Sequence, residues 1–188
     1  MRQWDLETGQ CILTMDILWA MSSSKAERRQ TGFLLDSYLL DQGDFVGALQ
    51  FRYDGLASGT EDGAIRMWDL RTGQVHRTLL GHTGPITCLQ FDDFHIVSGS
   101  IDKSIKIWDL RTGSVIDTFA YDNSITSLQF DSHKIICSAN TNDIKMYNRI
   151  SFQHSSLGEH ISPVQCIRYK DSILASGGLD NVIKIWAL

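Results

Sequence analysis

The chain has 188 residues, of which 43% are hydrophobic and 21% are charged, a composition typical of a folded domain. The formal net charge of −5 and the absence of any dense run of Lys or Arg disfavour nucleic acid as the main partner. The longest apolar run, Ile17–Met21, is far shorter than the ~20 residues of a membrane-spanning helix. The N-terminus also lacks a signal-peptide pattern, so no direct membrane insertion is expected.

One aromatic position recurs along the chain at nearly constant intervals. The first interval is 64 residues, and the later ones are 40, 39 and 39 residues. The members of the series are Trp4, Trp68, Trp108, Tyr147 and Trp186. A period of about 40 residues indicates an array of similar structural units.

Each repeat contains three short segments that are rich in β-branched residues and end at Gly, Asp, Asn or Ser, which is the pattern of strands joined by turns. Examples are Cys88–Phe91 (CLQF), Ile96–Gly99 (IVSG) and Ile105–Leu110 (IKIWDL). A fourth strand fits the stretch after each Trp-Asp pair, such as Gln74–Leu80 (QVHRTLL). Four strands per repeat, with Gly-His and Trp-Asp landmarks, resemble the blade of a WD40 β-propeller. The predicted fold class is therefore all-β, with four-stranded antiparallel blades.

The first unit, residues 1–18, is a half blade, because its aromatic landmark stands close to its start. Residues 19–42 form an insertion, in which Ser24 and Glu27 make a capping box that favours a short surface helix. The insertion is either a solvated loop or a loop that contacts a partner, and the residues leave both interpretations open.

Four further blades are predicted at residues 43–80, 81–119, 120–157 and 158–188, the last without its fourth strand. The total is about 4.5 blades of an expected seven. We therefore expect an incomplete propeller that lacks its N-terminal blades. Its open ends would expose apolar faces and unpaired strand edges.

Two blades carry the same quartet at identical spacing between Ser, Asp and Trp. The residues are His82, Ser98, Asp102 and Trp108 in one blade, and His160, Ser176, Asp180 and Trp186 in the other. A catalytic Ser-His-Asp triad is one interpretation, since triads are recognised by geometry and not by chain order. An enzyme needs one such site, however, whereas a repeated fold needs one brace per blade. The resemblance to WD40 proteins implies a structural tetrad, in which Asp bonds His, His bonds Ser, and Ser bonds the Trp ring N–H.

Two other blades depart from this quartet. The blade of Trp68 keeps Ser58 and Asp62, but no Gly-His precedes them. The blade of Tyr147 is expected to use Ser138, with one residue fewer in the turn that follows. We expect these two blades to be the looser ones.

Two recurrent residue types have ordinary structural interpretations. A cation stands two residues before the aromatic in four blades, and we expect stems packed between blades with solvated charged ends. These cations are Arg66, Lys106, Lys145 and Lys184. The four cysteines show no spacing typical of zinc or disulfide frameworks, and we interpret them as reduced thiols.

WD40 propellers mostly act as docking platforms, with contacts from the loops before the first strand and between the second and third strands. The candidate partner-binding residues in those loops are Glu61, Gly63, Thr83, Gly84, Ile101, Lys103, Leu179 and Asn181. No phosphate loop, catalytic carboxylate pair or metal-ligand cluster is present in the sequence. We therefore expect a non-catalytic scaffold with protein partners, and neither a cofactor nor a metal.

Within WD40 proteins, the segment Leu80–Gly113 and the long insertion before it resemble the C-terminal propeller of the fungal mitochondrial division adaptors. The resemblance implies a cytoplasmic protein that recruits a dynamin-related GTPase for fission, peripherally bound to the cytosolic face of the mitochondrial outer membrane. In that family the receptor-binding and self-association regions precede the propeller, and we expect neither of them within this sequence.

The alternative is the substrate-receptor propeller of F-box ubiquitin ligases, whose repeats also read Cys-Leu-Gln-Phe-Asp and Ile-Val-Ser-Gly-Ser. Those receptors bind phosphorylated degrons through arginines on the ring face. The candidate residues include Lys103 but no arginine cluster, which disfavours this alternative.

Overall fold

The computed structural model describes residues 1–15, 45–53 and 55–188. The predicted insertion at residues 19–42, with its capping box at Ser24 and Glu27, lies outside them. Regular secondary structure in the described residues consists of β-strands. None of these residues belongs to a helix long and apolar enough to cross a membrane.

The strands form a hairpin, three four-stranded antiparallel sheets and one three-stranded antiparallel sheet, all from strands consecutive in the chain. The hairpin contains β1 (Arg2–Trp4) and β2 (Cys11–Thr14). The first sheet contains β3 (Val46–Arg52), β4 (Gly55–Thr60), β5 (Ile65–Asp69) and β6 (Gln74–Leu79). The second contains β7 (Ile86–Phe91), β8 (His95–Ser100), β9 (Ser104–Asp109) and β10 (Val115–Ala120). The third contains β11 (Ser127–Phe130), β12 (Lys134–Ser138), β13 (Asp143–Asn148) and β14 (His154–Gly158), and the fourth contains β15 (Val164–Lys170), β16 (Ile173–Gly178) and β17 (Ile183–Ala187).

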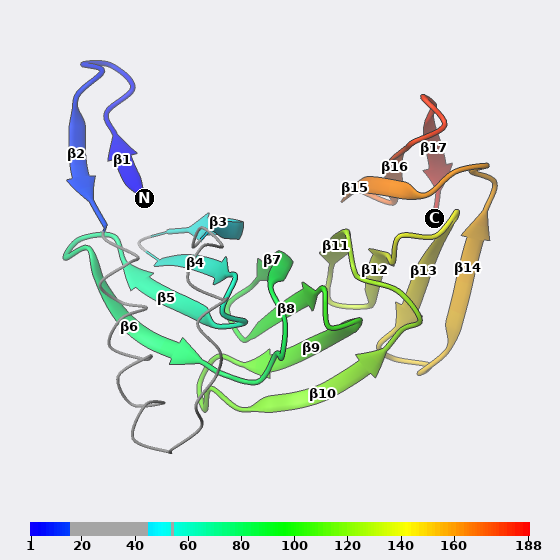
Figure 1. The fold of residues 1–188 in the computed structure, drawn as a ribbon, viewed down its shortest axis with the longest axis horizontal. Coiled ribbons are helices and arrows are strands. Elements are labelled where there is room, and N and C mark those ends of the chain that lie inside the picture. Colours follow the sequence, from blue (N-terminus) through cyan, green and yellow to red (C-terminus); the bar gives the residue numbers. More distant parts are fainter. Residues whose placement is uncertain (16–44, 54) are drawn as a thin grey trace, which may run out of the picture.

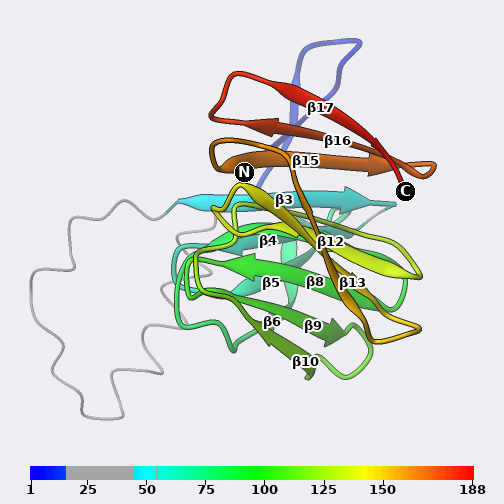
Figure 2. The ribbon, with the colours of Figure 1, turned by 90° about the vertical axis from the view of Figure 1, so that its right-hand side faces the viewer.

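The sheets are arranged in an open arc (Figure 1). The first strands of the sheets, β3, β7, β11 and β15, lie toward the inside of the arc and contact one another in sequence, while β6, β10 and β14 lie on its outer side. In the view turned by 90°, β15, β16 and β17 lie at one end of the molecule and β9 and β10 at the other (Figure 2). The described strands do not close into a ring, and the prediction of an incomplete propeller with four-stranded antiparallel blades is confirmed.

The apolar core lies between successive sheets, because strand residues point alternately to the two faces of a sheet. In β9, Ile105 and Ile107 face the third sheet, where they pack with Leu128 and Phe130. All four side chains are buried. Burial of each such side chain stabilises the fold by roughly 1.5–3 kcal/mol, so contacts between sheets hold the array together.

The same positions are open on the fourth sheet. Ile183 and Ile185 of β17 correspond to Ile105 and Ile107 of β9, but they are 77% and 67% exposed. Among the described residues, no sheet packs against this face. An apolar face of this kind promotes association in solution.

Candidate functional site

The quartet of the second sheet forms a connected hydrogen-bond chain. His82 Nδ1 lies 2.8 Å from Asp102 Oδ2, and His82 Nε2 lies 2.8 Å from Ser98 Oγ. Trp108 Nε1–H donates to the same Ser98 Oγ at 2.8 Å. The chain joins the loop before β7 to β8 and β9, so it links three parts of one sheet that are up to 26 residues apart in sequence.

The fourth sheet repeats this geometry. His160 Nδ1 is 2.8 Å from Asp180 Oδ2, and His160 Nε2 is 2.8 Å from Ser176 Oγ. Trp186 Nε1–H donates to Ser176 Oγ at 2.9 Å. The structure therefore brings together all eight residues that the repeat singled out, in two equivalent clusters.

The electrostatics of the second-sheet quartet keep its His neutral and its Asp charged. Burial lowers the pKa of His82, although the hydrogen bond with Asp102 opposes this effect. Burial opposes ionisation of Asp102, but hydrogen bonds from Ser104, the Thr83 N–H and His82 outweigh it and lower the pKa of Asp102 to about 2. A buried serine that accepts a Trp N–H and pairs with a neutral His has no free path to a substrate, and this arrangement suits a brace.

The first sheet replaces the His–Asp pair with an Arg–Asp pair. Trp68 Nε1–H donates to Ser58 Oγ at 2.8 Å, as in the quartets. Arg66 Nη2 lies 2.7 Å from Asp62 Oδ2, and its Nη1 donates to Thr60 Oγ1 at 2.6 Å. The expectation that Arg66 has a solvated charged end is wrong, because its side chain is 0% exposed. A buried guanidinium needs a carboxylate, and Asp62 supplies it.

The corresponding lysines in the other sheets remain partly open to solvent. Lys106 Nζ donates to Thr118 Oγ1 at 3.2 Å, and Lys145 Nζ lies 3.2 Å from Asp143. Lys184 Nζ lies 3.6 Å from a carboxylate oxygen of Glu159. The first sheet is thus the one described sheet in which this cation belongs to the interior.

The third sheet has no polar quartet, and the residue predicted for it is wrong. Cys137 pairs across the sheet with Lys145, as Ser98 pairs with Lys106, so Cys137 and not Ser138 occupies the serine position. Tyr121 occupies the position of the quartet histidine, because it stands four residues before Ile125, as His82 stands four residues before Ile86. The predicted shortening of the turn is also wrong, since Cys137 and Tyr147 have the same separation as Ser98 and Trp108.

Apolar packing, with a hydrogen bond between Tyr121 and Cys137, therefore takes the place of the polar quartet in the third sheet. Cys137 and Tyr147 are buried in one core cluster, and Tyr121 packs against it. Burial raises the pKa of Cys137 to about 11 and also raises the pKa of Tyr121. Both groups are neutral at pH 7, which suits an apolar site. All four cysteines of the chain are free thiols.

The candidate partner-binding residues lie at one end of the strands, where backbone bonds tie the two kinds of loop together. Ile101 N–H donates to Pro85 O at 3.0 Å, and Leu179 N–H donates to Pro163 O at 3.0 Å. Exposed candidates are Thr83, Ile101, Lys103, Leu179 and Asn181, while Glu61 and Gly84 are half-buried. Gly63 is buried, so it is not accessible to a partner.

Gly63, Lys103 and Asn181 occupy the same place in three turns. Their φ angles are +75°, +67° and +60°, in the left-handed region. A Cβ on Gly63 would lie 2.7 Å from His82 O, so this turn also lies against the neighbouring sheet and needs glycine. Lys103 and Asn181 instead project exposed side chains from their turns.

Sequence analysis missed Ile161, which is 82% exposed in the loop before β15. Its N–H donates to Asp180 Oδ2 at 3.1 Å, as the N–H of Thr83 donates to Asp102. The repeat contained the signal, because Ile161 directly follows a quartet His just as Thr83 does. Ile161 and Leu179 together make this end of the fourth sheet apolar.

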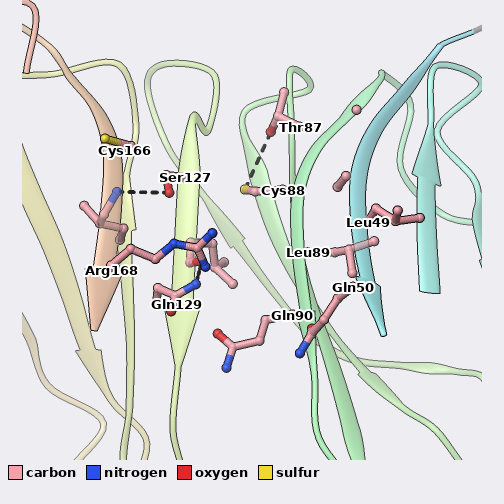
Figure 3. A pocket seen from close by; sticks show the side chains of 14 residues that line it. Leu49, Gln50, Thr87, Cys88, Leu89, Gln90, Ser127, Gln129, Cys166 and Arg168 are labelled. Atoms are coloured by element: carbon pink, nitrogen blue, oxygen red, sulfur yellow. Dashed lines mark hydrogen bonds between the residues drawn. The ribbon is translucent and has the colours of Figure 1, made fainter. Parts of the chain in front are cut away.

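The inner strands line a hollow of about 380 Å³ on the concave side of the arc. Figure 3 shows its side chains, with three glutamines and one arginine at equivalent positions of successive strands. These residues are Gln50, Gln90, Gln129 and Arg168. The hollow has no cluster of titratable groups, and no set of three His, Cys, Asp or Glu side chains suited to a metal ion occurs within the described residues.

Two of these glutamines join neighbouring sheets by hydrogen bonds to the backbone. Gln90 Oε1 accepts the N–H of Phe130 at 2.7 Å, and its Nε2 donates to Phe130 O at 3.0 Å. Gln50 makes the same pair of bonds with Phe91, at 2.6 and 3.4 Å. Gln129 instead donates to Leu128 O in its own strand. Sequence analysis missed these hydrogen bonds, although the recurrence of Gln before the aromatic of the first strand was their signal.

The repeated sheets, the two quartets and the exposed loop ends define the class of protein. A family model described as "WD domain, G-beta repeat" matches residues 39–69, 73–109 and 152–187, and the chain belongs to this WD40-repeat family. WD40 repeats form scaffolds for protein interactions. The family model does not match residues 110–151. This stretch contains Cys137 and Tyr147, where the quartet is replaced.

Several curated relatives of this chain carry the name of a mitochondrial division protein. The whole chain is 54% identical to "Mitochondrial division protein 1" of Malassezia globosa, of which it covers 32%. It is 52% identical over 99% of its length to the protein of the same name from Coccidioides immitis, of which it covers 30%. The chain thus spans about a third of the length of the curated relatives that it matches.

Two solved structures of designed proteins share the fold. The computationally designed Ika8 protein matches with a TM-score of 0.73 and 28% identity, over 100% of this chain and 52% of that chain. The computationally designed Ika4 protein matches with a TM-score of 0.71 and 32% identity, over 80% of this chain and 95% of that chain.

Proposed function

We propose that this chain is the docking part of a non-catalytic adaptor that recruits a dynamin-related GTPase for mitochondrial fission. The observation that carries the proposal is the similarity over the full chain to proteins named for mitochondrial division. The adaptor as a whole acts peripherally, on the cytosolic face of the outer mitochondrial membrane. The units at residues 1–18, 43–80, 81–119, 120–157 and 158–188 act as its repeats.

The geometry supports binding in preference to catalysis. The two serines that could serve as nucleophiles, Ser98 and Ser176, are buried and accept a Trp N–H. Apolar and charged groups are exposed instead at the loop end, where Ile101, Lys103 and Leu179 project. Exposed apolar side chains beside a charge are typical of a protein-binding surface. The names of the relatives favour this function over the ubiquitin-ligase alternative.

A binding experiment with the dynamin-related GTPase of Malassezia globosa tests the proposal. The full chain is immobilised, and binding of the GTPase is measured by surface plasmon resonance. Substitution Leu179→Ser or Lys103→Glu should weaken binding by about tenfold, since loss of one central contact costs about 1–2 kcal/mol. Leu6→Ser is the matched control, because Leu6 is also exposed but lies in the β1–β2 turn. Absence of binding to the unmodified chain would refute recruitment of the GTPase by these repeats.

A further inference from the structure

The turn between β13 and β14 differs from the equivalent turns of three other hairpins. Those turns have a left-handed glycine at one position, with φ of +67° at Gly9, +70° at Gly73 and +76° at Gly113. Phe152 occupies this position in the β13–β14 turn, with φ of +57°. A bulky residue has a steric cost there that glycine avoids. Phe152 is 73% exposed, so packing inside the chain does not compensate for the cost.

Phe152 lines a small groove between the second and third sheets. Ile116 of β10, 55% exposed, lines it from the second sheet, and the buried side chains of Ile107 and Tyr147 contribute its inner surface. The volume is about 180 Å³. This is below the ~300 Å³ at which pockets for small molecules begin. The groove therefore suits one apolar side chain of a partner better than a cofactor.

The charged groups at the groove indicate the charge of that partner. Arg149 and His95 also line the groove. Arg149 keeps its positive charge, but its guanidinium is held toward its own sheet, 5.9 Å from the centre of the Phe130 ring, and donates to Asp131 O at 3.3 Å. His95 Nδ1 lies 3.7 Å from a carboxylate oxygen of Asp92. The carboxylate of Asp117 accepts the N–H of Thr118 at 2.7 Å and forms no ion pair with a cation in the described part of the chain. An exposed carboxylate beside an apolar groove is complementary to a Lys or Arg side chain.

We propose that the groove formed by Ile116, Asp117 and Phe152 is an interaction surface for a partner segment with an aliphatic side chain next to a Lys or Arg. The aliphatic side chain packs between Ile116 and Phe152, and the cation pairs with Asp117. Backbone outliers that packing does not explain often mark functional contacts. The groove lies at the opposite end of the strands from Ile101 and Leu179, because the turns before and after a strand lie at its two opposite ends. It is therefore independent of the function proposed above.

The test uses the full chain and three acetylated, amidated pentapeptides. Their sequences are Ala-Arg-Leu-Arg-Ala, Ala-Arg-Ala-Arg-Ala and Ala-Glu-Leu-Glu-Ala. In NMR titrations, the first peptide should shift the amide signals of Ile116, Asp117 and Phe152. The other two should bind about tenfold more weakly, because each lacks one of the two contacts. Equal binding of all three, or shifts confined to other parts of the chain, would overturn the proposal.

Substitutions separate a binding role of Phe152 from a folding role. Phe152→Gly introduces the residue of the three sister turns, so the melting temperature should stay unchanged or rise while affinity for the first peptide falls about tenfold. Tyr53→Gly is the matched control, because Tyr53 is also an exposed aromatic with a positive φ but does not line the groove. Asp117→Asn should remove the preference for the Arg peptide over the Glu peptide. A lower melting temperature of Phe152→Gly with unchanged peptide affinity would show that the ring serves folding, and would refute the proposal.

Discussion

Ser98 is the hydrogen-bond partner of two buried side chains, His82 and Trp108. Its Oγ accepts from Trp108 Nε1 and pairs with His82 Nε2, each at 2.8 Å, and Ser98 itself is fully buried. Ser98→Ala leaves both groups unpaired in the interior, so the free energy of unfolding should fall by about 2–4 kcal/mol. Urea unfolding followed by Trp fluorescence measures this change.

The matched control is Ser114→Ala. Ser114 is exposed, and its hydroxyl pairs only with Thr112 in the turn before β10. A change within about 0.5 kcal/mol is expected for such a site. Similar losses for Ser98→Ala and Ser114→Ala would contradict the role of the quartet as a brace.

Arg66 and Asp62 form a buried ion pair in the first sheet, 2.7 Å apart. Removal of one partner of such a pair leaves a buried charge without compensation. Arg66→Ala is therefore expected to lower the free energy of unfolding by about 3–5 kcal/mol. Lys145→Ala is the control, since the pair of Lys145 with Asp143 is much more open to solvent, and it should change the free energy by less than about 1 kcal/mol. Comparable effects in chemical denaturation would show that burial of the Arg66 pair does not matter.

The quartet makes stability depend on pH in two steps. Because burial lowers the pKa of His82, its unfolded state binds a proton more readily, and stability should decline as the pH falls below the ordinary value of 6.5. The pKa of Asp102 is about 2 in the fold and 3.8 without it, so its contribution is present above pH 3.8 and is lost as the pH falls toward 2. Thermal melts across this range should show both declines, and a His82→Gln variant should lack the upper one.

At the scale of the element, the inner strands are joined by side chains as well as by apolar packing. The bonds of Gln90 with the backbone of Phe130 act as a short bridge between β7 and β11. Gln90→Leu should lower the free energy of unfolding by about 1–3 kcal/mol, since the Phe130 backbone groups lose their partner. Gln129→Leu is the control, because Gln129 bonds only within its own strand. An equal loss of unfolding free energy in both variants would show that the hydrogen bonds of Gln90 do not stabilise the contact between β7 and β11.

Strand positions were predictable because each blade repeats a local pattern of β-branched residues and turn residues. Single positions within a strand were less predictable where a residue departs from the repeat. Alignment of the motif placed Ser138 in the serine position of the third sheet, whereas the pairing of β12 with β13 places Cys137 there. Register is set by which face of the strand is buried, and one residue of slip reverses that face. Ser138 directly follows Cys137, so matching the motif to the serine shifts the predicted register by one residue.

At the scale of the whole molecule, the arc has an open apolar face on the fourth sheet, with Ile183 and Ile185 exposed. This face should make the chain associate as its concentration rises. Ile185→Lys is expected to shift the chain toward the monomer in light scattering, because it introduces a charge into that face. Ile161→Lys is the control, since Ile161 is equally apolar and exposed but lies in the loop before β15. Unchanged association of Ile185→Lys would show that another surface is responsible.

The sequence by itself determined the repeat, the four-stranded antiparallel blades and the residues of the two quartets. These features depend on spacing within about 40 residues, and spacing is written directly in the chain. The sequence also indicated which loops would lie together, because every second turn of an antiparallel sheet lies at the same end of the strands.

Only the tertiary structure decided which side chains are buried and which of them meet across sheets. It paired Arg66 with Asp62 in the interior, joined Gln90 to Phe130 and placed Phe152 at the edge of a groove. It also buried Gly63 while leaving Ile161 exposed. The physical reason is that burial and partnership depend on the neighbouring sheet, whose atoms come from about 40 residues away. A local pattern therefore carries no record of them.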